Sequence, residues 1–314
     1  MLEAQDLVVE FPGRGGRRAR AVDGVNLSVG GGEIVALVGE SGCGKTTLAR
    51  TLLGLERPTS GQVSYDGIPL NYSGRRLRAF RRQVQLVLQD PMGSLNPRQT
   101  VYEAVAEGPR IHGLPDEEAV VASALSRAGL RPPERFFLRY PHELSGGQRQ
   151  RVVIAGALAL DPRVLIADEP VASLDASVRG EILALLLRLR DDLGLSALVV
   201  THDLGLAWNI ADRVAVMYLG RIVESGPTED VLTNPRHPYT QALLSVLPES
   251  PQRIVLSGEP PDPTRIPTGC RFHPRCQLVA NGNGAEACHS TPLPILPATK
   301  DAQVACWMAP GRTH

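Results

Sequence analysis

A glycine-rich stretch near the N-terminus has the residue types and spacing of a phosphate-binding loop. It runs from Gly39 to Thr46 and reads G-E-S-G-C-G-K-T, which fits the pattern G-x-x-x-x-G-K-[ST]. The apolar run 34–38 precedes it and helix-forming residues 47–53 follow, which is the context that the motif requires. Backbone N–H groups of such a loop surround phosphates, and the helix N-terminus favours their negative charge.

Individual roles within this loop follow from side-chain chemistry. We expect Lys45 to reach the β- and γ-phosphates of a nucleotide and Thr46 to bind Mg²⁺. Cys43 occupies a free position of the motif, where a small residue is tolerated. The residues expected to line the phosphate site are Ser41, Gly42, Cys43, Gly44, Lys45, Thr46 and Thr47.

Two acidic residues, Asp168 and Glu169, follow directly after the apolar run 164–167. Asp168 suits Mg²⁺, either directly or through water. Glu169 is the candidate general base, because a carboxylate beside the γ-phosphate can orient and polarise an attacking water. Two acids after an apolar run would otherwise be the solvated end of a strand, but beside a phosphate-binding loop the functional interpretation is favoured.

Four apolar runs, each followed by polar residues, indicate the fold that positions these groups. The runs are 34–38, 84–88, 164–167 and 197–200, and the last three are followed by Gln89, Asp168 and Thr201-His202. Alternation of apolar runs with amphipathic stretches predicts an α/β domain with a largely parallel sheet. Open α/β sheets bind ligands beyond the carboxyl ends of their strands, so we expect these ends to converge.

Helices are predicted between and after these strands. Residues 97–160 contain no good strand candidate, while 116–130 and 148–160 both have helical patterns, which predicts a mainly helical insertion. Another helix is predicted over 178–193, which has an apolar and a charged side.

Composition describes an ordinary globular protein and excludes some classes of function. Lysine plus arginine equals aspartate plus glutamate at 33 each, so no basic surface for nucleic acid is indicated. The N-terminus does not resemble a signal peptide, and no apolar run approaches the ~20 residues that span a bilayer. A transport role would therefore need partner subunits. A basic run is interpreted as a solvated face: Arg75, Arg76, Arg78, Arg81 and Arg82.

The chain changes character after about residue 247. Eleven of the 26 prolines and four of the five cysteines lie between residues 248 and 310. Prolines at this density exclude long helices and central strands. Four clustered cysteines in a chain without an export signal favour metal binding over disulfides. These are Cys270, Cys276, Cys288 and Cys306.

The cysteine spacing is C-x5-C-x11-C-x17-C, which is neither the zinc-ribbon pairing nor the compact ferredoxin run. Spacing alone therefore indicates four thiolates and leaves the metal open. His273 and His289 lie close by and could substitute for a thiolate at a zinc site.

A third motif decides among the many proteins that use phosphate-binding loops. Residues 144–148 read L-S-G-G-Q, the signature of ABC ATPases, and the chain resembles an ABC transporter ATPase. Its other motifs occur in order: Gln89 matches the Q-loop, Ser173-Leu174-Asp175 the D-loop, and His202 the switch histidine. Phe11 is placed where the family stacks an aromatic ring on adenine. An unrelated P-loop kinase would not explain this set.

The resemblance implies a P-loop NTPase core with a parallel sheet, an antiparallel β subdomain and a helical insertion. It also implies that two subunits meet head to tail, each signature capping ATP bound to the other. Catalytic roles then fall to Glu169, His202 and Gln89, and Mg²⁺ to Thr46, Gln89 and Asp168. The partner's nucleotide would contact Ser145, Gly146, Gly147, Gln148 and Asp175.

A narrower resemblance, to the oligopeptide/dipeptide (peptide/nickel) permease family, covers nearly the whole chain. It rests on residues 89–97 (QDPMGSLNP), 140–144 (YPHEL), 234–243 (NPRHPYTQAL) and 269–276 (GCRFHPRC). It implies peptide import at the cytoplasmic face of the cell membrane, energised by ATP. The implied partners are two transmembrane permease subunits, a solute-binding protein and a second, related but different ATPase chain. Residues 90–100 would lie where a membrane subunit docks.

In that family the C-terminal cysteines are associated with a [4Fe–4S] cluster, so the resemblance favours this cluster over zinc or no metal. We predict a nucleotide-binding domain over 1–247, with the helical subdomain at 97–160, and a cysteine-containing extension over 248–314. Nickel or another small solute remains an alternative cargo. A soluble ABC ATPase acting on ribosomes or DNA is disfavoured by the single cassette, the absence of coiled-coil heptads and the neutral charge.

Overall fold

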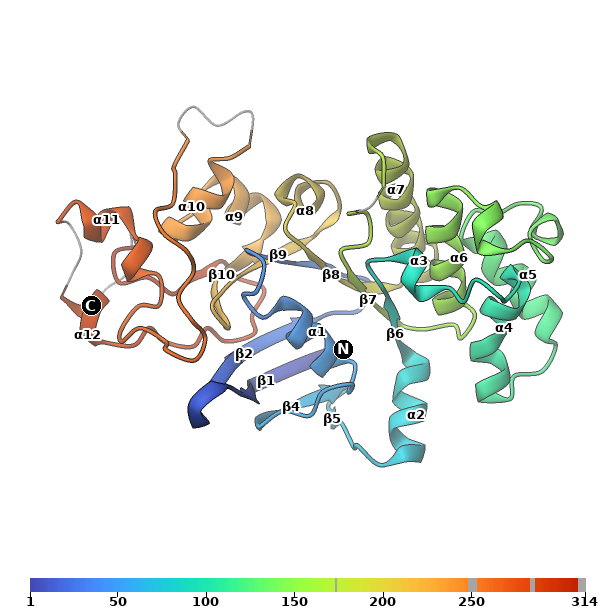
Figure 1. The fold of residues 1–314 in the computed structure, drawn as a ribbon, viewed down its shortest axis with the longest axis horizontal. Coiled ribbons are helices and arrows are strands. Elements are labelled where there is room, and N and C mark those ends of the chain that lie inside the picture. Colours follow the sequence, from blue (N-terminus) through green and yellow to red (C-terminus); the bar gives the residue numbers. More distant parts are fainter. Residues whose placement is uncertain (173, 248–252, 283–285, 310–314) are drawn as a thin grey trace. The chain divides into compact units, whose positions relative to one another are not determined.

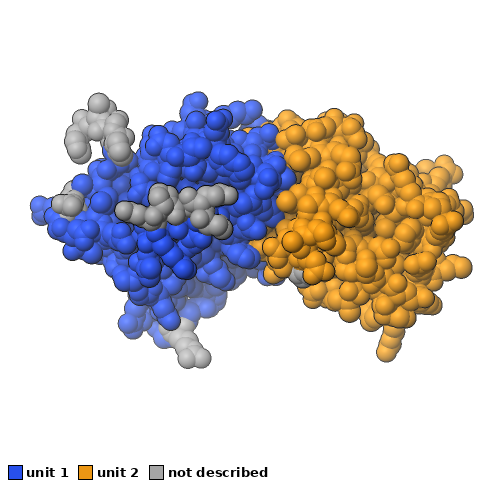
Figure 2. Space-filling model, turned by 90° about the horizontal axis from the view of Figure 1, so that it is seen from above, with its two compact units in different colours: residues 1–29, 35–70, 201–314 blue, residues 30–34, 71–200 orange. Residues whose placement is uncertain are grey.

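The computed structural model describes residues 1–314 except 173, 248–252, 283–285 and 310–314. The chain forms two compact units, which are considered separately (Figures 1 and 2). Unit 1 comprises residues 1–29, 35–70 and 201–314, and unit 2 comprises residues 30–34 and 71–200. The predicted boundary between residues 247 and 248 meets the undescribed stretch 248–252 and stays a prediction.

Unit 1 contains an antiparallel sheet with the strand order β2-β1-β4-β5. A bulge in β1 keeps its apolar residues on one face. Leu2 and Ala4 are buried, the pairing register then shifts around Asp6 (φ 45°), and Leu7 and Val9 are buried after it. The strands are β1 (Leu2–Pro12), β2 (Arg18–Val29), β4 (Ser60–Tyr65) and β5 (Ile68–Pro69).

Other strands of unit 1 follow the order β11-β10-β9-β3, in which β3 pairs with β9 in parallel and β9 with β10 antiparallel. Every residue of β3 is buried, as a strand covered on both faces requires. Helix α1 follows β3 and packs on β1 and β2. The bounds are β3 (Ile34–Val38), α1 (Lys45–Leu52), β9 (Arg213–Tyr218), β10 (Arg221–Pro227) and β11 (Gln303–Val304).

The proline-rich tail belongs to unit 1 and contains short elements only, as its composition predicts. Its single described strand, β11, lies at the edge of its sheet. The Arg213 guanidinium donates to the Thr299 carbonyl at 2.8 Å, and Arg221 donates to the Leu293 carbonyl at 3.0 Å, which fixes the tail to β9 and β10. The helices of the tail are η4 (His273–Arg275), α11 (Gln277–Ala280) and α12 (Ala287–Ser290). The other helices of unit 1 lie before the tail and are η1 (Arg14–Gly16), α8 (Leu204–Ile210), α9 (Thr228–Thr233) and α10 (Pro238–Leu244).

Unit 2 is built on three parallel strands in the order β8-β7-β6, followed and covered by helices. Its strands are β6 (Val84–Val87), β7 (Val164–Asp168) and β8 (Ser196–Thr201). Helices α4, α5 and α6 pack on one another as the predicted helical insertion (Figure 1). The helices are α2 (Gly74–Gln83), α3 (Pro91–Ser94), α4 (Val101–His112), α5 (Glu117–Arg127), η2 (Pro133–Arg135), η3 (Pro141–Glu143), α6 (Gly146–Leu158) and α7 (Ala176–Leu193).

The predicted α/β fold is confirmed, including the antiparallel subdomain and the helical insertion. The helices predicted over 116–130, 148–160 and 178–193 correspond to α5, α6 and α7. Among the described residues, no helix has the length and apolar character that crossing a bilayer demands.

Candidate nucleotide-binding and hydrolysis site

The phosphate-binding loop turns sharply between β3 and α1, and two of its positions accept no residue other than glycine. A Cβ on Gly39 (φ 153°) would lie 2.2 Å from the Met217 carbonyl oxygen, and one on Gly44 (φ 110°) would lie 2.0 Å from the Ala21 carbonyl oxygen. Any side chain at either position would therefore force the neighbouring strand away. These contacts pack the loop closely against β9 and β2.

Lys45, the first residue of α1, is buried with its ammonium group inside the loop. Its Nζ donates to the carbonyl oxygens of Gly39 at 2.6 Å and Glu40 at 2.9 Å. The Cys43 sulfur lies 3.9 Å from the same Nζ, and burial raises the pKa of the Cys43 thiol. A positive charge is thus held at the centre of the loop, where phosphate oxygens can replace carbonyl oxygens as its partners.

The outer rim of the loop is open to solvent. Ser41, Gly42 and Thr46 are exposed and Thr47 is half-buried, so backbone N–H groups and the Thr46 hydroxyl are accessible to a ligand. Phe11 lies near the end of β1, pairs with Ala19 of β2 and is half-exposed.

In unit 2, two strands end in the predicted polar groups. Strand β6 pairs with β7 in parallel up to Val87 and Ala167, so Gln89 and the acids Asp168 and Glu169 lie at the same end of neighbouring strands. Glu169 has φ 49° and donates its backbone N–H to the Val200 carbonyl oxygen at 2.8 Å. Both acids are half-buried and Gln89 is exposed.

The signature motif forms the start of helix α6. The Ser145 hydroxyl accepts from the Gln148 N–H at 3.2 Å, and the Gln148 side chain accepts from the Ser145 N–H at 3.0 Å. This capping box stabilises the helix N-terminus, whose dipole favours an anion. A Cβ on Gly147 would lie 2.6 Å from Val178 Cγ1, so glycine here permits close packing of α6 and α7.

The last two predicted groups, the D-loop and His202, lie just before helices α7 and α8. Asp175 is the exposed N-cap of α7, whereas Ser173 of the same motif lies outside the described residues. His202 is exposed and directly follows β8. The following Asp203 caps α8 by accepting from the Leu206 N–H at 3.1 Å.

All four clustered cysteines are buried and line one pocket of unit 1, together with His237, Phe272 and His273. Burial raises the pKa of Cys270 to about 12 and also raises that of Cys306, so these thiols are protonated without a bound cation. The rings of His273 and His289 lie edge to face, with centroids 4.8 Å apart. Throughout the described part of the chain, no group of three or more His, Cys, Asp or Glu is arranged to hold a metal ion.

Sequence reasoning missed two residues of unit 1 that contact the phosphate-binding loop. The Arg275 guanidinium forms a bidentate ion pair with the Glu40 carboxylate, at 2.7 and 3.1 Å. The Tyr239 hydroxyl accepts from the Glu40 backbone N–H at 2.8 Å. Both lie about 200 or more residues from Glu40 in the chain, and no short motif could have predicted the contacts.

The fold and these groups define the class of the protein, which is a P-loop ATPase of the ABC cassette type. A family model described as ABC transporter matches residues 22–172, and one described as Oligopeptide/dipeptide transporter, C-terminal region, matches residues 223–282.

Three relatives illustrate the similarity. The chain is 46% identical to the dipeptide transport ATP-binding protein DppF of Escherichia coli over 291 residues, covering 88% of this chain and 86% of DppF. It is 44% identical to the oligopeptide transport ATP-binding protein AppF of Bacillus subtilis over 297 residues, covering 89% of this chain and 90% of AppF. Among solved structures, the dimeric bacterial ABC transporter cassette MJ0796 matches with a TM-score of 0.64 at 30% identity, covering 73% of this chain and 99% of MJ0796.

The chain therefore belongs to the ATP-binding subunits of the oligopeptide/dipeptide family of ABC transporters. It is an ABC-type ATPase, and its expected ligands are ATP and Mg²⁺.

Proposed function

We propose that the chain binds and hydrolyses ATP at the cytoplasmic face of the membrane and thereby drives import of dipeptides or oligopeptides. A single observation carries the choice of cargo: an ABC cassette and an oligopeptide/dipeptide transporter C-terminal region occur in one chain. The names of DppF and AppF support it, since both denote peptide transport.

The proposed roles follow from chemistry and placement. The loop of residues 39–47 holds the phosphates through backbone N–H groups and Lys45, while Thr46, Gln89 and Asp168 supply Mg²⁺ ligands. Glu169 orients and polarises the attacking water, and His202 contacts the γ-phosphate. Phe11 stacks on adenine.

The proposed assembly contains more than this chain. Ser145, Gly146, Gly147, Gln148 and Asp175 would contact ATP held by a second, related ATPase. Two transmembrane permease subunits carry the cargo, and a solute-binding protein delivers it. Residues 90–100 are the proposed docking segment for a membrane subunit. Its helix α3 is short and is capped by the preceding Asp90, whose carboxylate accepts from the Met92 N–H at 2.9 Å.

Uptake in reconstituted vesicles tests the proposal. The complete complex should accumulate a labelled dipeptide or oligopeptide when Mg-ATP is supplied on the side of this chain, and the Glu169→Gln complex should bind ATP without uptake. Uptake of nickel without any peptide uptake would contradict the assigned cargo. ATP hydrolysis without transport of any solute would contradict the transport role.

We propose further that the pocket of Cys270, Cys276, Cys288 and Cys306 holds a [4Fe–4S] cluster. Four buried cysteines lining one pocket are the donor set that such a cluster takes. When bound, the cluster would fasten a proline-rich segment that has little core of its own.

Metal analysis of the chain purified without oxygen tests this assignment. We expect about four irons per chain, the content of one [4Fe–4S] cluster, with matching sulfide and broad visible absorption that is lost in Cys276→Ser. Cys43→Ser is the matched control, since Cys43 lies outside the pocket and should leave the iron content unchanged. Stoichiometric zinc, or no metal, would contradict the cluster and leave the ATPase assignment intact.

A further inference from the structure

The turn that carries the first two tail cysteines contacts the phosphate-binding loop directly. Helix η4 ends at Arg275, one residue before Cys276, and its guanidinium forms the bidentate pair with Glu40. Only 6% of the Arg275 side chain and 27% of the Glu40 side chain is exposed. A bidentate, largely buried charge pair fixes both partners in position and orientation far better than an exposed one.

A second connection reaches the same loop residue through aromatic packing. Phe272 is buried against Tyr218 and Tyr239, with ring centroids 5.2 and 5.5 Å away. The Tyr239 hydroxyl accepts from the Glu40 N–H at 2.8 Å. The turn of residues 270–276 thus reaches the Glu40 side chain through Arg275 and the Glu40 backbone through Phe272 and Tyr239.

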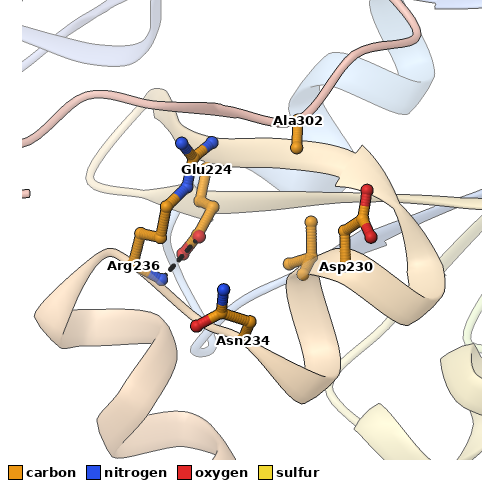
Figure 3. Close-up of a pocket in the computed structure, with 6 residues that line it drawn as sticks. Glu224, Asp230, Asn234, Arg236 and Ala302 are labelled. Carbon is orange, nitrogen blue, oxygen red and sulfur yellow. Dashed lines mark hydrogen bonds between the residues drawn. The ribbon is translucent and has the colours of Figure 1, made fainter. Parts of the chain in front are cut away.

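Tyr239 is itself held by a buried polar network at the start of α10. Its backbone N–H donates to His237 Nδ1 at 3.0 Å, and burial lowers the pKa of His237 to about 3, which keeps that nitrogen an acceptor. The Glu224 carboxylate accepts the backbone N–H groups of Arg236 at 2.7 Å and His237 at 3.0 Å. Figure 3 shows Glu224 pointing at the Arg236 backbone in a second pocket, separate from that of the cysteines, which Asp230, Asn234 and Ala302 also line.

Glu40 is therefore fixed at three points in a loop that has little stiffness of its own. Its side chain is held by Arg275, its N–H by Tyr239 and its carbonyl by Lys45. The glycines at 39, 42 and 44 all have positive φ and give the loop many alternative conformations when it is not restrained. A restrained loop has already lost the conformational entropy that ligand binding would otherwise remove, so it binds more tightly.

We propose that Arg275 is a positioning residue for ATP, which holds the phosphate-binding loop in its binding conformation through Glu40. The proposal rests on the proposed role of residues 39–47 as the phosphate site. It gives the C-terminal extension a function in the ATPase cycle, since the turn that carries Cys270 and Cys276 sets the nucleotide affinity.

The test measures the Kd for MgADP by calorimetry on the full chain purified without oxygen. If loss of the pair leaves the loop in its binding conformation for only about one-tenth of the time, the apparent Kd weakens roughly tenfold. We expect that weakening in Arg275→Ala and in Glu40→Gln, and no further loss in the double variant. The KM for ATP should rise in parallel, with kcat at saturating ATP changed less than about twofold because the pair does not touch the reacting atoms.

Matched variants separate positioning from general damage. Arg275→Lys keeps the charge but loses the bidentate geometry, so its Kd should lie between wild type and Arg275→Ala. Arg265→Ala removes an exposed arginine of the same tail and should leave the Kd unchanged. Metal content is measured in every variant, and Glu40→Gln tests the pair without altering the cysteine-bearing turn.

An unchanged Kd in both Arg275→Ala and Glu40→Gln would overturn the inference. So would additive losses in the double variant, because two residues that act through one contact cannot lose it twice. Lys45→Ala distinguishes this failure from a wrong nucleotide site: it should abolish MgADP binding whether or not Arg275 acts on the loop.

Discussion

At the scale of single residues, the glycines of the phosphate-binding loop differ in how strongly a side chain in their place would clash. A Cβ on Gly44 would lie 2.0 Å from the Ala21 carbonyl oxygen, whereas one on Gly42 (φ 77°) would meet nothing within 4 Å. Gly42→Ala should cost about 1–2 kcal/mol from the left-handed backbone alone. Gly44→Ala should cost about 3 kcal/mol or more, because β2 must move.

Thermal unfolding of the two variants checks this difference. For a chain of this size each kcal/mol shifts the midpoint by about 2–4 °C, so the variants should differ by several degrees. Equal midpoints would show that the loop accommodates a side chain at Gly44 without moving β2.

Single residues also show which features the sequence could predict and which it could not. Lys45, Asp168 and Glu169 were predictable because each stands at a fixed offset from an apolar strand, and local spacing determines their placement. The Arg275–Glu40 pair joins residues 235 apart, and the stretch 269–276 indicates the family without indicating any partner for Arg275. Only the folded tail brings the two together.

At the scale of elements, helices α6 and α7 approach closely because Gly147 has no side chain. A Cβ there would lie 2.6 Å from Val178 Cγ1, so Gly147→Ala should lower stability by about 1–3 kcal/mol. Val178→Ala in the same chain should recover much of that loss by removing the clashing methyl groups. Differential scanning calorimetry on the single and double variants measures both effects.

Gly156 provides the matched control within the same helix. A Cβ on Gly156 would meet nothing within 4 Å, so Gly156→Ala should raise stability by about 0.5–1 kcal/mol through helix propensity. If Gly147→Ala behaved like Gly156→Ala, close packing of α6 on α7 would not be the reason for glycine in the signature motif.

Element types were predictable wherever one period dominated the sequence. Strands β3, β7 and β8 are nearly continuous apolar runs, and α7 has an apolar and a charged side. Strand β1 carries a register shift around Asp6 that breaks its alternation, so no simple period marks its eleven residues. The tail elements have four residues or fewer, too short for any period to be read.

At the scale of the whole molecule, the residues assigned to ATP hydrolysis are divided between the two compact units. The phosphate-binding loop and His202 belong to unit 1, while Gln89, Ser145, Asp168 and Glu169 belong to unit 2. The exposed Ser145 sits at the start of α6, where the helix dipole favours phosphate, yet residues 39–47 are already the proposed phosphate site of the chain. This is why we propose a second subunit's nucleotide as the ligand of the signature motif.

The proposed head-to-tail arrangement of two subunits predicts how Glu169→Gln behaves in solution. Glutamine keeps the shape of the side chain but cannot act as a general base, so hydrolysis should fall at least about 100-fold while ATP still binds. Because ATP would be held by a loop of one subunit and a signature of the other, unhydrolysed ATP should keep two subunits together. Light scattering should show a dimer with Mg-ATP and a monomer without nucleotide.

The signature motif supplies the control for this dimer. Ser145→Arg combined with Glu169→Gln should still bind ATP through Lys45, yet stay monomeric, because a bulky cation replaces the small cap residue that would face the second nucleotide. Association of Glu169→Gln only after addition of the related ATPase chain would indicate a heterodimer. ATP binding without association under either condition would contradict the head-to-tail arrangement, and near-normal turnover in Glu169→Gln would remove Glu169 from its assigned role.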